Sequence, residues 1–226
     1  MESKFEKTIS LLGDISYDNL SSKHVAICGL GGVGGYVVEM IARFGVSHIT
    51  LIDFDKVSIS NFNRQIIAID TNIDKYKTIC FKDRILSIND KCTVDIISEK
   101  IDEDFFKKHS DILNPDFLFD CIDDKYGKIA IYKYCKSHDI DFISSMGTGN
   151  NIKENLVITD IEKTKNCPLA KVMRKLCKDN NISDIKVIYN DIQEAHNLSG
   201  TLPTIPSIAG IKMVHYFIAK VLLQTQ

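Results

Sequence analysis

Residues 24–35 read HVAICGLGGVGG, a short apolar segment that runs directly into a glycine-rich turn. The apolar residues at 25–27 predict a buried strand, and the apolar residues after the turn predict a helix. Gly29, Gly31 and Gly34 fit the pattern G-x-G-x-x-G. Such a turn brings backbone N–H groups and the positive end of a helix dipole close to a phosphate. The stretch therefore predicts a phosphate-binding turn at the start of a nucleotide-binding fold.

Strands and helices alternate along the chain on both sides of this turn. Short β-branched or apolar runs predict the strands, and longer segments with a helical period predict the helices. We expect strands at 24–29, 48–53, 93–98, 116–122 and 141–145, and helices at 5–20, 32–44, 74–89, 102–109 and 126–138. This alternation predicts an α/β fold with a Rossmann-like, mostly parallel sheet and helices on both faces.

The pattern changes after Met146, where we expect a C-terminal extension of mixed strands and helices. A single domain over residues 1–226 is expected, with a nucleotide-binding core at 24–146 and a substrate-side extension at 147–226. Within the extension we expect strands at 156–160 and 186–189, a basic helix at 168–179, a long polar loop at 190–204 and a C-terminal helix at 207–223.

The composition excludes several classes of protein. A formal net charge of −2 argues against coating nucleic acid by bulk electrostatics. The seven cysteines contain no C-x-x-C pair, which fits reduced thiols in a cytoplasmic protein and not a disulfide framework or a C-x-x-C zinc site. The charged N-terminus predicts no signal peptide. The most apolar stretch, 205–223, is interrupted by polar residues and a proline, so no membrane span is expected.

Charged side chains follow the ends of the predicted strands. Asp53 ends the second strand, 24 residues after Gly29, where a carboxylate is placed to accept hydrogen bonds from ribose hydroxyls. Arg64 and Lys77 add two cations that suit phosphoryl or nucleotidyl transfer. Asp123, at another strand end, is placed to hold Mg²⁺. Composition alone explains Arg64 and Lys77 equally well as solvated surface residues.

The string DFDKVSISNFNRQ at 53–65 closely resembles the signature of the ThiF/MoeB/HesA family of ubiquitin-activating-enzyme-like adenylating enzymes. In that family an Arg is followed thirteen residues later by a Lys, and then by an Asp at a strand end. Arg64, Lys77 and Asp123 match that spacing, and the resemblance covers residues 24–130. It implies an adenylating domain that uses ATP and Mg²⁺.

The resemblance also implies a role for each matching residue. Asp53 would hold the ribose, Asn61, Arg64 and Lys77 would hold the phosphates and the adenylate, and Gln65 would line the pocket. Asp123 would engage Mg²⁺–ATP. The implied nucleotide-binding set is Gly29, Gly31, Gly34, Asp53, Asp55, Asn61, Arg64, Gln65, Lys77 and Asp123. Arg64, Lys77 and Asp123 are the implied catalytic residues.

Four segments of the C-terminal half resemble one branch of the family, the tRNA threonylcarbamoyladenosine dehydratases. They are MGTGN at 146–150, TDIEKT at 159–164, PLAKVMR at 168–174 and IPSIAG at 205–210. The resemblance then extends over nearly the whole chain. It implies ATP-dependent cyclisation of N6-threonylcarbamoyladenosine at position 37 of tRNA through an acyl-adenylate, by a homodimer.

The sequence departs from this branch at two positions. Lys7 stands where the branch usually has an Arg that reaches the phosphates of the partner subunit, so the charge is kept and the bidentate fork is lost. Cys167 stands where an Asp usually precedes Pro-Leu-Ala.

The basic helix supports an RNA partner. Lys171, Arg174, Lys175 and Lys178 recur at i, i+3, i+4 and i+7, so they share one face. Such a stripe is suited to tRNA phosphates, although it is equally typical of an ordinary solvated helix face.

Other functions remain open. A ThiF- or MoeB-type enzyme would adenylate the C-terminal glycine of a ubiquitin-like sulfur carrier and would bring a sulfur or cysteine-desulfurase partner. The missing C-x-x-C pairs and the absence of cysteine from loop 190–204 count against it. Arg64 and Lys77 disfavour an NAD-dependent dehydrogenase, and together with Asp123 they disfavour a non-catalytic partner of a heterodimer. Candidate reactive groups outside the motif are Cys167, Cys177 and His196.

Overall fold

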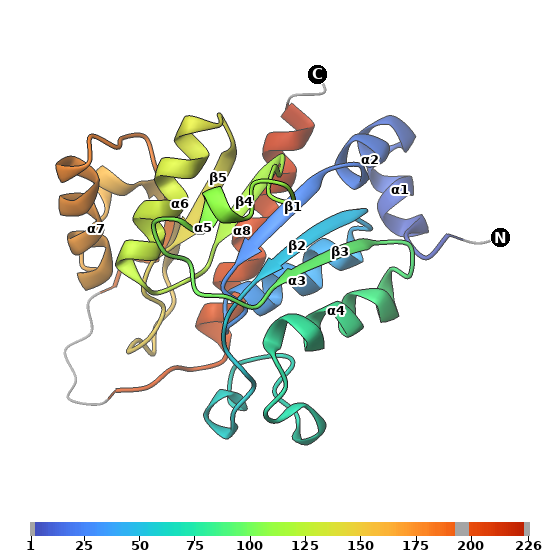
Figure 1. Ribbon diagram of the computed structural model, residues 1–226, viewed down its shortest axis with the longest axis horizontal. Helices are drawn as coiled ribbons and strands as arrows, with labels where there is room; N and C mark the ends of the chain where they lie inside the picture. The colour runs from blue at the N-terminus through green and yellow to red at the C-terminus, as the bar shows by residue number, and fades with distance from the viewer. Residues whose placement is uncertain (1–2, 193–198, 224–226) are drawn as a thin grey trace.

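A single seven-stranded sheet runs through the computed structural model, which describes residues 3–192 and 199–223 (Figure 1). The strand order is β3-β2-β1-β4-β5-β7-β6, and all neighbouring strands are parallel except β6 and β7. The strands are β1 (His24–Cys28), β2 (His48–Ile52), β3 (Thr93–Ile97), β4 (Phe117–Asp120), β5 (Asp141–Ser145), β6 (Leu156–Asp160) and β7 (Lys186–Asn190). This confirms the predicted α/β fold with a mostly parallel sheet.

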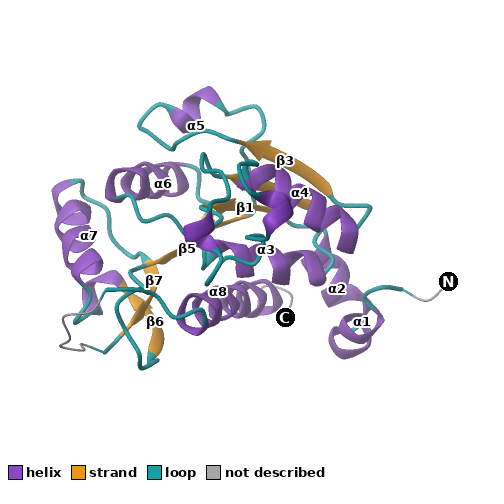
Figure 2. Ribbon diagram, turned by 90° about the horizontal axis from the view of Figure 1, so that it is seen from below, coloured by secondary structure: helices purple, strands orange, loops and turns teal. Residues whose placement is uncertain are grey.

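Helices cover both faces of the sheet (Figure 2). One face carries α3 (Gly34–Arg43), α4 (Lys77–Ile88) and α8 (Thr204–Leu223), and the other carries α5 (Phe105–Lys108), α6 (Lys125–Ser137) and α7 (Pro168–Asp179). Each face has its own hydrophobic core, because the strands are buried on both sides. Short 3₁₀ turns lie at Ile59–Asn61, Asp70–Asn72 and Ile161–Lys163.

The N-terminal lead-in differs from the single helix expected at 5–20. It forms two helices, α1 (Glu6–Leu12) and α2 (Asp14–Ser21), because Gly13 between them has φ of 77°, outside the helical region. Helix α1 buries none of its residues, and Leu11 is 84% exposed.

The glycine-rich turn packs against the end of β4. Gly29 has φ of 86°, and a Cβ at Gly34 would lie 1.8 Å from the carbonyl oxygen of Gly29. Both positions therefore require glycine. The turn lies between β1 and β4, where the strand order changes direction. This is the switch point at which open α/β sheets bind ligands.

The apolar C-terminal stretch forms α8, which begins at Thr204, three residues before the predicted start. Among the described helices, α8 is long and apolar enough to cross a membrane by length and composition. Half of that apolar window is buried within this fold, where Ile205, Met213 and Phe217 belong to the core. A Cβ at Gly210 would lie 2.5 Å from the carbonyl oxygen of Val33, so the glycine permits close packing of α8 on α3.

A fully buried ion pair joins α6 to the centre of the sheet. The Nζ of Lys128 donates to Asp120 Oδ2 at 2.9 Å, to Ser144 Oγ at 3.1 Å and to the carbonyl oxygen of Ser145 at 2.8 Å. The hydroxyl of Ser144 donates to the same carboxylate oxygen at 2.6 Å. All three protons of the ammonium are thereby used, which is the condition under which a buried charge is tolerated.

Candidate nucleotide-binding site

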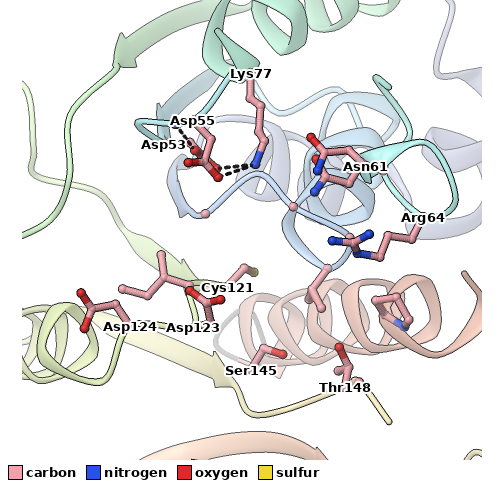
Figure 3. Close-up of a pocket in the computed structure, with 18 of the residues that line it drawn as sticks. Asp53, Asp55, Asn61, Arg64, Lys77, Cys121, Asp123, Asp124, Ser145 and Thr148 are labelled. Carbon is pink, nitrogen blue, oxygen red and sulfur yellow. Dashed lines mark hydrogen bonds and ion pairs between the residues drawn. The ribbon is translucent and has the colours of Figure 1, made fainter. Parts of the chain in front are cut away.

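A cavity of about 460 Å³ opens at the carboxyl ends of the central strands (Figure 3). Its lining contains the predicted nucleotide-site residues Gly29, Gly31, Asp53, Asp55, Asn61, Arg64, Gln65, Lys77 and Asp123. Gly34 lies behind the turn, where it serves the packing described above. Because parallel strands end at one edge, predicted residues as far apart in the sequence as Gly29 and Asp123, 94 positions, line the same cavity.

The side chain of Asp53 is hydrogen-bonded to the backbone of the glycine-rich turn. Its Oδ2 accepts a hydrogen bond from the backbone N–H of Leu30 at 2.6 Å, and its Oδ1 accepts one from Asp55 at 2.7 Å. Burial raises the pKa of Asp53, and the nearby Lys77 opposes that rise. A carboxylate has about four lone-pair sites, so both oxygens keep capacity for ligand hydroxyls.

Lys77 is a buried cation of the site and not a solvated surface residue. Its side chain is 4% exposed, and its Nζ lies 2.8 Å from Asp55 Oδ2 and 3.9 Å from Asp53 Oδ2. It is the first residue of α4, and its backbone N–H donates to the carbonyl oxygen of Asp55 at 3.0 Å. Figure 3 shows the ammonium and the two carboxylates on one side of the cavity. The carboxylates of Asp53 and Asp55 thus fix the position of the Lys77 ammonium, which borders the cavity and can contact an anionic ligand.

The segment between β2 and α4, residues 53–76, supplies the other polar groups and is called the crossover segment below. The side-chain oxygen of Asn61 accepts from the backbone N–H of Ser58 at 3.0 Å, which fixes the 3₁₀ turn. Arg64 uses one guanidinium nitrogen to donate to the carbonyl oxygen of Ser60 and to Asn63 Oδ1, both at 2.8 Å, and it lines the cavity. The remaining donors of its fork are suited to an anion. Among the residues that the structure describes, the buried Oε1 of Gln65 finds no hydrogen-bond donor, so a donor on a ligand would satisfy it.

Two carboxylates follow β4, and they differ in their partners. Asp124 caps α6 by accepting from the backbone N–H of Tyr126 at 2.9 Å, and it pairs with Lys100 at 3.0 Å. Asp123 lines the cavity and makes no hydrogen bond or ion pair with any residue in the described ranges 3–192 and 199–223. Its oxygens are therefore available to a ligand or a cation.

The candidate thiols lie on the buried side of the basic helix. Cys167 is 8% exposed and Cys177 is 2% exposed. Burial raises the pKa of Cys177 to about 11, so at neutral pH it is a thiol and not the nucleophilic thiolate. Cys121 lines the cavity, but burial raises its pKa even further. His196, the candidate base on the long loop, lies outside the described residues.

The predicted basic stripe of α7 divides into two parts. Lys171, Lys175 and Lys178 are exposed, as a surface that contacts phosphates would require. Arg174 is partly buried, and its Nη1 donates to the carbonyl oxygen of Thr164 at 2.9 Å and to the hydroxyl of the same residue. Arg174 therefore attaches α7 to the turn that precedes it.

One side of the cavity consists of residues that the sequence did not predict as site residues. Ser145 is the last residue of β5, and residues 147–149 follow that strand. Thr201 precedes α8, and Pro206 lies in its first turn. The rule that ligands lie beyond the carboxyl ends of parallel strands would have indicated residues 145–149, because they directly follow a predicted strand. No local signal marks Thr201, which is brought to the cavity by the packing of α8.

A phosphate-binding turn, a strand-end carboxylate and two cations at a topological switch point define a nucleotide-binding α/β protein. More specifically, the chain belongs to the ThiF family, whose model matches residues 5–225.

Several relatives of the chain are tRNA threonylcarbamoyladenosine dehydratases. The chain is 39% identical over 172 residues to the tRNA threonylcarbamoyladenosine dehydratase of Haemophilus influenzae. The matched residues cover 74% of this chain and 65% of that protein. It is 35% identical over 190 residues to the Bacillus subtilis enzyme of the same name, covering 83% and 74%. Its fold matches the E. coli tRNA N6-threonylcarbamoyladenosine dehydratase in complex with ATP, with a TM-score of 0.92 and 26% identity over 98% of this chain and 95% of that one.

Proposed function

We propose that this protein is an ATP-dependent tRNA threonylcarbamoyladenosine dehydratase, acting on N6-threonylcarbamoyladenosine at position 37 of tRNA. The observation that carries the proposal is the convergence of Arg64, Lys77 and Asp123 on the cavity beside the glycine-rich turn. Relatives with that name at 32–39% identity support it further. They also make the alternative, adenylation of the C-terminal glycine of a sulfur carrier, less supported.

The chemistry needs a leaving group that a carboxylate lacks. The substrate carboxylate attacks the α-phosphorus of ATP, the bond to the β-phosphate breaks, and pyrophosphate leaves. The resulting acyl-adenylate is then attacked intramolecularly, and AMP leaves. The nucleoside loses one water, and ATP is consumed as AMP and pyrophosphate. Negative charge that develops on phosphate oxygens in the first step is what Arg64 and Lys77 are suited to stabilise.

We assign the nucleotide contacts from the geometry of the free groups. The backbone of residues 29–34 would face the phosphates, and Asp53 would accept hydrogen bonds from the ribose. Asn61, Arg64 and Lys77 would hold the phosphates and the adenylate, because their cationic or amide groups border one cavity. Residues 24–146 and 147–226 would work as one unit, since the cavity takes side chains from both.

Magnesium is the cofactor that the acidic part of the cavity would accept. Asp53, Asp55, Glu99, Asp123 and Asp124 outnumber the cations of the lining, and ATP brings further negative charge. Mg²⁺ prefers carboxylate and phosphate oxygens and keeps several waters, so one free carboxylate fits it. Among the described residues, no three His, Cys, Asp or Glu side chains form a group that could hold a metal ion by themselves, so the phosphates would supply the remaining ligands.

Replacing Asp123 by asparagine should raise the Mg²⁺ concentration needed for half-maximal AMP formation by about tenfold, because one oxygen charge near the cation is lost. The measurement is a Mg²⁺ titration of ATP turnover at saturating ATP. Asp111→Asn, on the exposed surface, is the matched control. An unchanged titration curve for Asp123→Asn would remove Asp123 from the magnesium site.

The exposed lysines of α7 are proposed to contact tRNA phosphates. Changing Lys171, Lys175 and Lys178 together to alanine should weaken tRNA binding and reduce its dependence on salt, because fewer counterions are released. ATP binding should not change, because none of the three lines the cavity. Binding measured at several salt concentrations tests this, and an unchanged slope would identify the stripe as an ordinary solvated face.

We also propose a homodimer in the cytoplasm. Large apolar side chains are exposed on the lead-in and on the crossover segment, including Leu11 at 84%, Ile15 at 80% and Ile59 at 76%. Analytical ultracentrifugation would contradict the dimer by giving the mass of a single 25.5 kDa chain at micromolar concentration.

A cysteine desulfurase or another sulfur-transferring protein stays a predicted partner. Failure of such a protein to co-purify with this chain would count against that prediction.

The decisive experiment is ATP turnover with and without tRNA that carries N6-threonylcarbamoyladenosine, followed by mass analysis of the nucleoside. AMP formation that depends on this tRNA, with the nucleoside lighter by the mass of one water, is the expected result. AMP formation that requires a carrier protein ending in glycine would overturn the dehydratase proposal while leaving the adenylation site intact.

A further inference from the structure

The cavity has a second wall that the nucleotide contacts do not use. Figure 3 shows Ser145 and Thr148 across the cavity from Asp53 and Lys77. Thr201 belongs to the same lining, with the apolar side chains of Met146, Leu169 and Pro206. This second wall comes from the C-terminal half of the chain, whereas the nucleotide contacts proposed above all come from residues 29–123.

Hydrogen bonds hold the second wall in place. The backbone N–H of Asn150 donates to the carbonyl oxygen of Gly200, and the N–H of Gly200 donates back to Asn150 Oδ1, both at 2.8 Å. The side chain of Asn63 donates to the carbonyl oxygen of Thr201 at 2.9 Å. Residues 147–151, residues 199–203 and the crossover segment are thus tied together, so the positions of Thr148 and Thr201 are fixed relative to Arg64.

The two threonine hydroxyls are free to bind a ligand. Neither Thr148 Oγ1 nor Thr201 Oγ1 hydrogen-bonds to a residue within 3–192 or 199–223, although both residues are partly buried and line the cavity. The Thr201 hydroxyl lies near Gly149, where an added Cβ would be 3.3 Å from it. A hydroxyl can donate one hydrogen bond and accept two, so the pair can recognise a hydroxyl or carbonyl on a small polar group.

We propose that Thr148 and Thr201 form the subsite for the amino-acid part of the acyl substrate and select an acyl group that carries a hydroxyl close to its carboxylate. This inference rests on the proposed function, in which that group is the threonyl moiety of N6-threonylcarbamoyladenosine. The carboxylate must reach the phosphate held by Arg64 and Lys77. The hydroxyl of a threonyl group is three bonds from the carboxyl carbon, so it must lie within a few ångströms of that carbon. The second wall borders the same cavity as Arg64 and Lys77, so its hydroxyl groups are the candidate partners of that hydroxyl. The apolar neighbours of the second wall suit its methyl group.

The test compares two synthetic anticodon stem-loop RNAs. One carries N6-threonylcarbamoyladenosine, and the other carries the analogue in which the threonyl hydroxyl is replaced by hydrogen. The unaltered protein should have a kcat/KM about tenfold higher for the first, because one net hydrogen bond is worth about that factor. Thr148→Val, which replaces the hydroxyl by a methyl group of similar size, should reduce this preference toward unity and leave the KM for ATP unchanged.

Two further variants separate recognition from folding. Thr148→Ser keeps the hydroxyl and should keep the preference. Thr159→Val makes the same substitution on β6, outside the cavity lining, and should change neither rate. Thr148→Val combined with Thr201→Val should abolish any preference that remains in the single variant.

Each failure has its own signature. If the unaltered protein processes both RNAs equally, or if the double variant keeps the preference, the subsite proposal is overturned and the proposed function stands. If the unaltered protein processes neither RNA but forms AMP with a carrier protein, the proposed function fails, and the subsite fails with it because its ligand is gone.

Discussion

Replacing Lys77 by methionine is expected to lower tRNA-dependent AMP formation by about two to three orders of magnitude. The ammonium is 4% exposed and is already held by Asp55 at 2.8 Å and by Asp53 at 3.9 Å. A cation fixed before the reaction needs no reorganisation when charge develops on the phosphates, and removal of one such group typically costs about 10²–10³ in rate. Pyrophosphate release at saturating ATP measures the effect.

The control for this prediction is Lys75→Met. Lys75 is exposed and lies two residues away, so its loss changes the net charge equally without touching the cavity. A rate for Lys77→Met within about threefold of the Lys75→Met rate would show that the electrostatic role is wrong. Circular dichroism melting of both variants distinguishes lost catalysis from lost folding, because Lys77→Met also leaves two carboxylates without their cation.

The second large effect concerns the buried ion pair beneath the cavity. Lys128→Met should lower the free energy of unfolding by about 3–5 kcal/mol, because it leaves the Asp120 carboxylate buried without its cation. Both side chains are 0% exposed, so solvent cannot replace the lost partner. Urea denaturation at neutral pH measures the change.

A double variant makes this prediction specific to charge. Lys128→Met combined with Asp120→Asn removes the stranded charge and should recover a substantial part of the stability, since an apolar or neutral replacement of a buried pair is often tolerated. If the double variant is less stable than Lys128→Met, packing of the lysine side chain and not its charge is the main contribution.

The Lys128–Asp120 ion pair also positions backbone groups next to the nucleotide cavity. Asp120 Oδ1 accepts from the backbone N–H of Ile122 at 3.3 Å, and the carbonyl oxygen of Ser145, which Lys128 holds, belongs to a residue that lines the cavity. The turn that carries Asp123 thus begins at a residue anchored in the core. Loss of the pair should therefore disturb the Mg²⁺ response as well as the stability.

The sequence predicted which residues between 29 and 77 line the cavity, because these residues are close together in the sequence. The glycine-rich turn, Asp53 and the spacing of Arg64 and Lys77 lie within 49 consecutive residues, 29–77, and each follows a recognisable element. Strand and helix types in the sheet were also predictable, since buried parallel strands have continuous apolar runs. The predicted helix at 102–109 is shorter in the structure, where α5 covers Phe105–Lys108.

The remaining features depend on tertiary packing and leave no local pattern. Lys128 occurs in a helix with several other lysines, and nothing in its neighbours marks it as fully buried. Thr148 and Thr201 line one cavity because Asn150 and Gly200 pair across 50 residues. The break at Gly13 reflects one backbone angle, which an otherwise helical pattern conceals.

Hydrogen bonds from Asn63 and Asn150 join segment 199–203 to the rest of the cavity, and a ligand that fills the space adds further contacts between these distant parts of the chain. Because the ligand binds only the folded state, it raises the free energy of unfolding of the whole domain by RT ln(1 + [L]/Kd). Segment 199–203, joined to the rest of the cavity through Asn63 and Asn150, would gain the most. We therefore expect bound substrate to slow hydrogen exchange in segment 199–203, far along the chain from the glycine-rich turn.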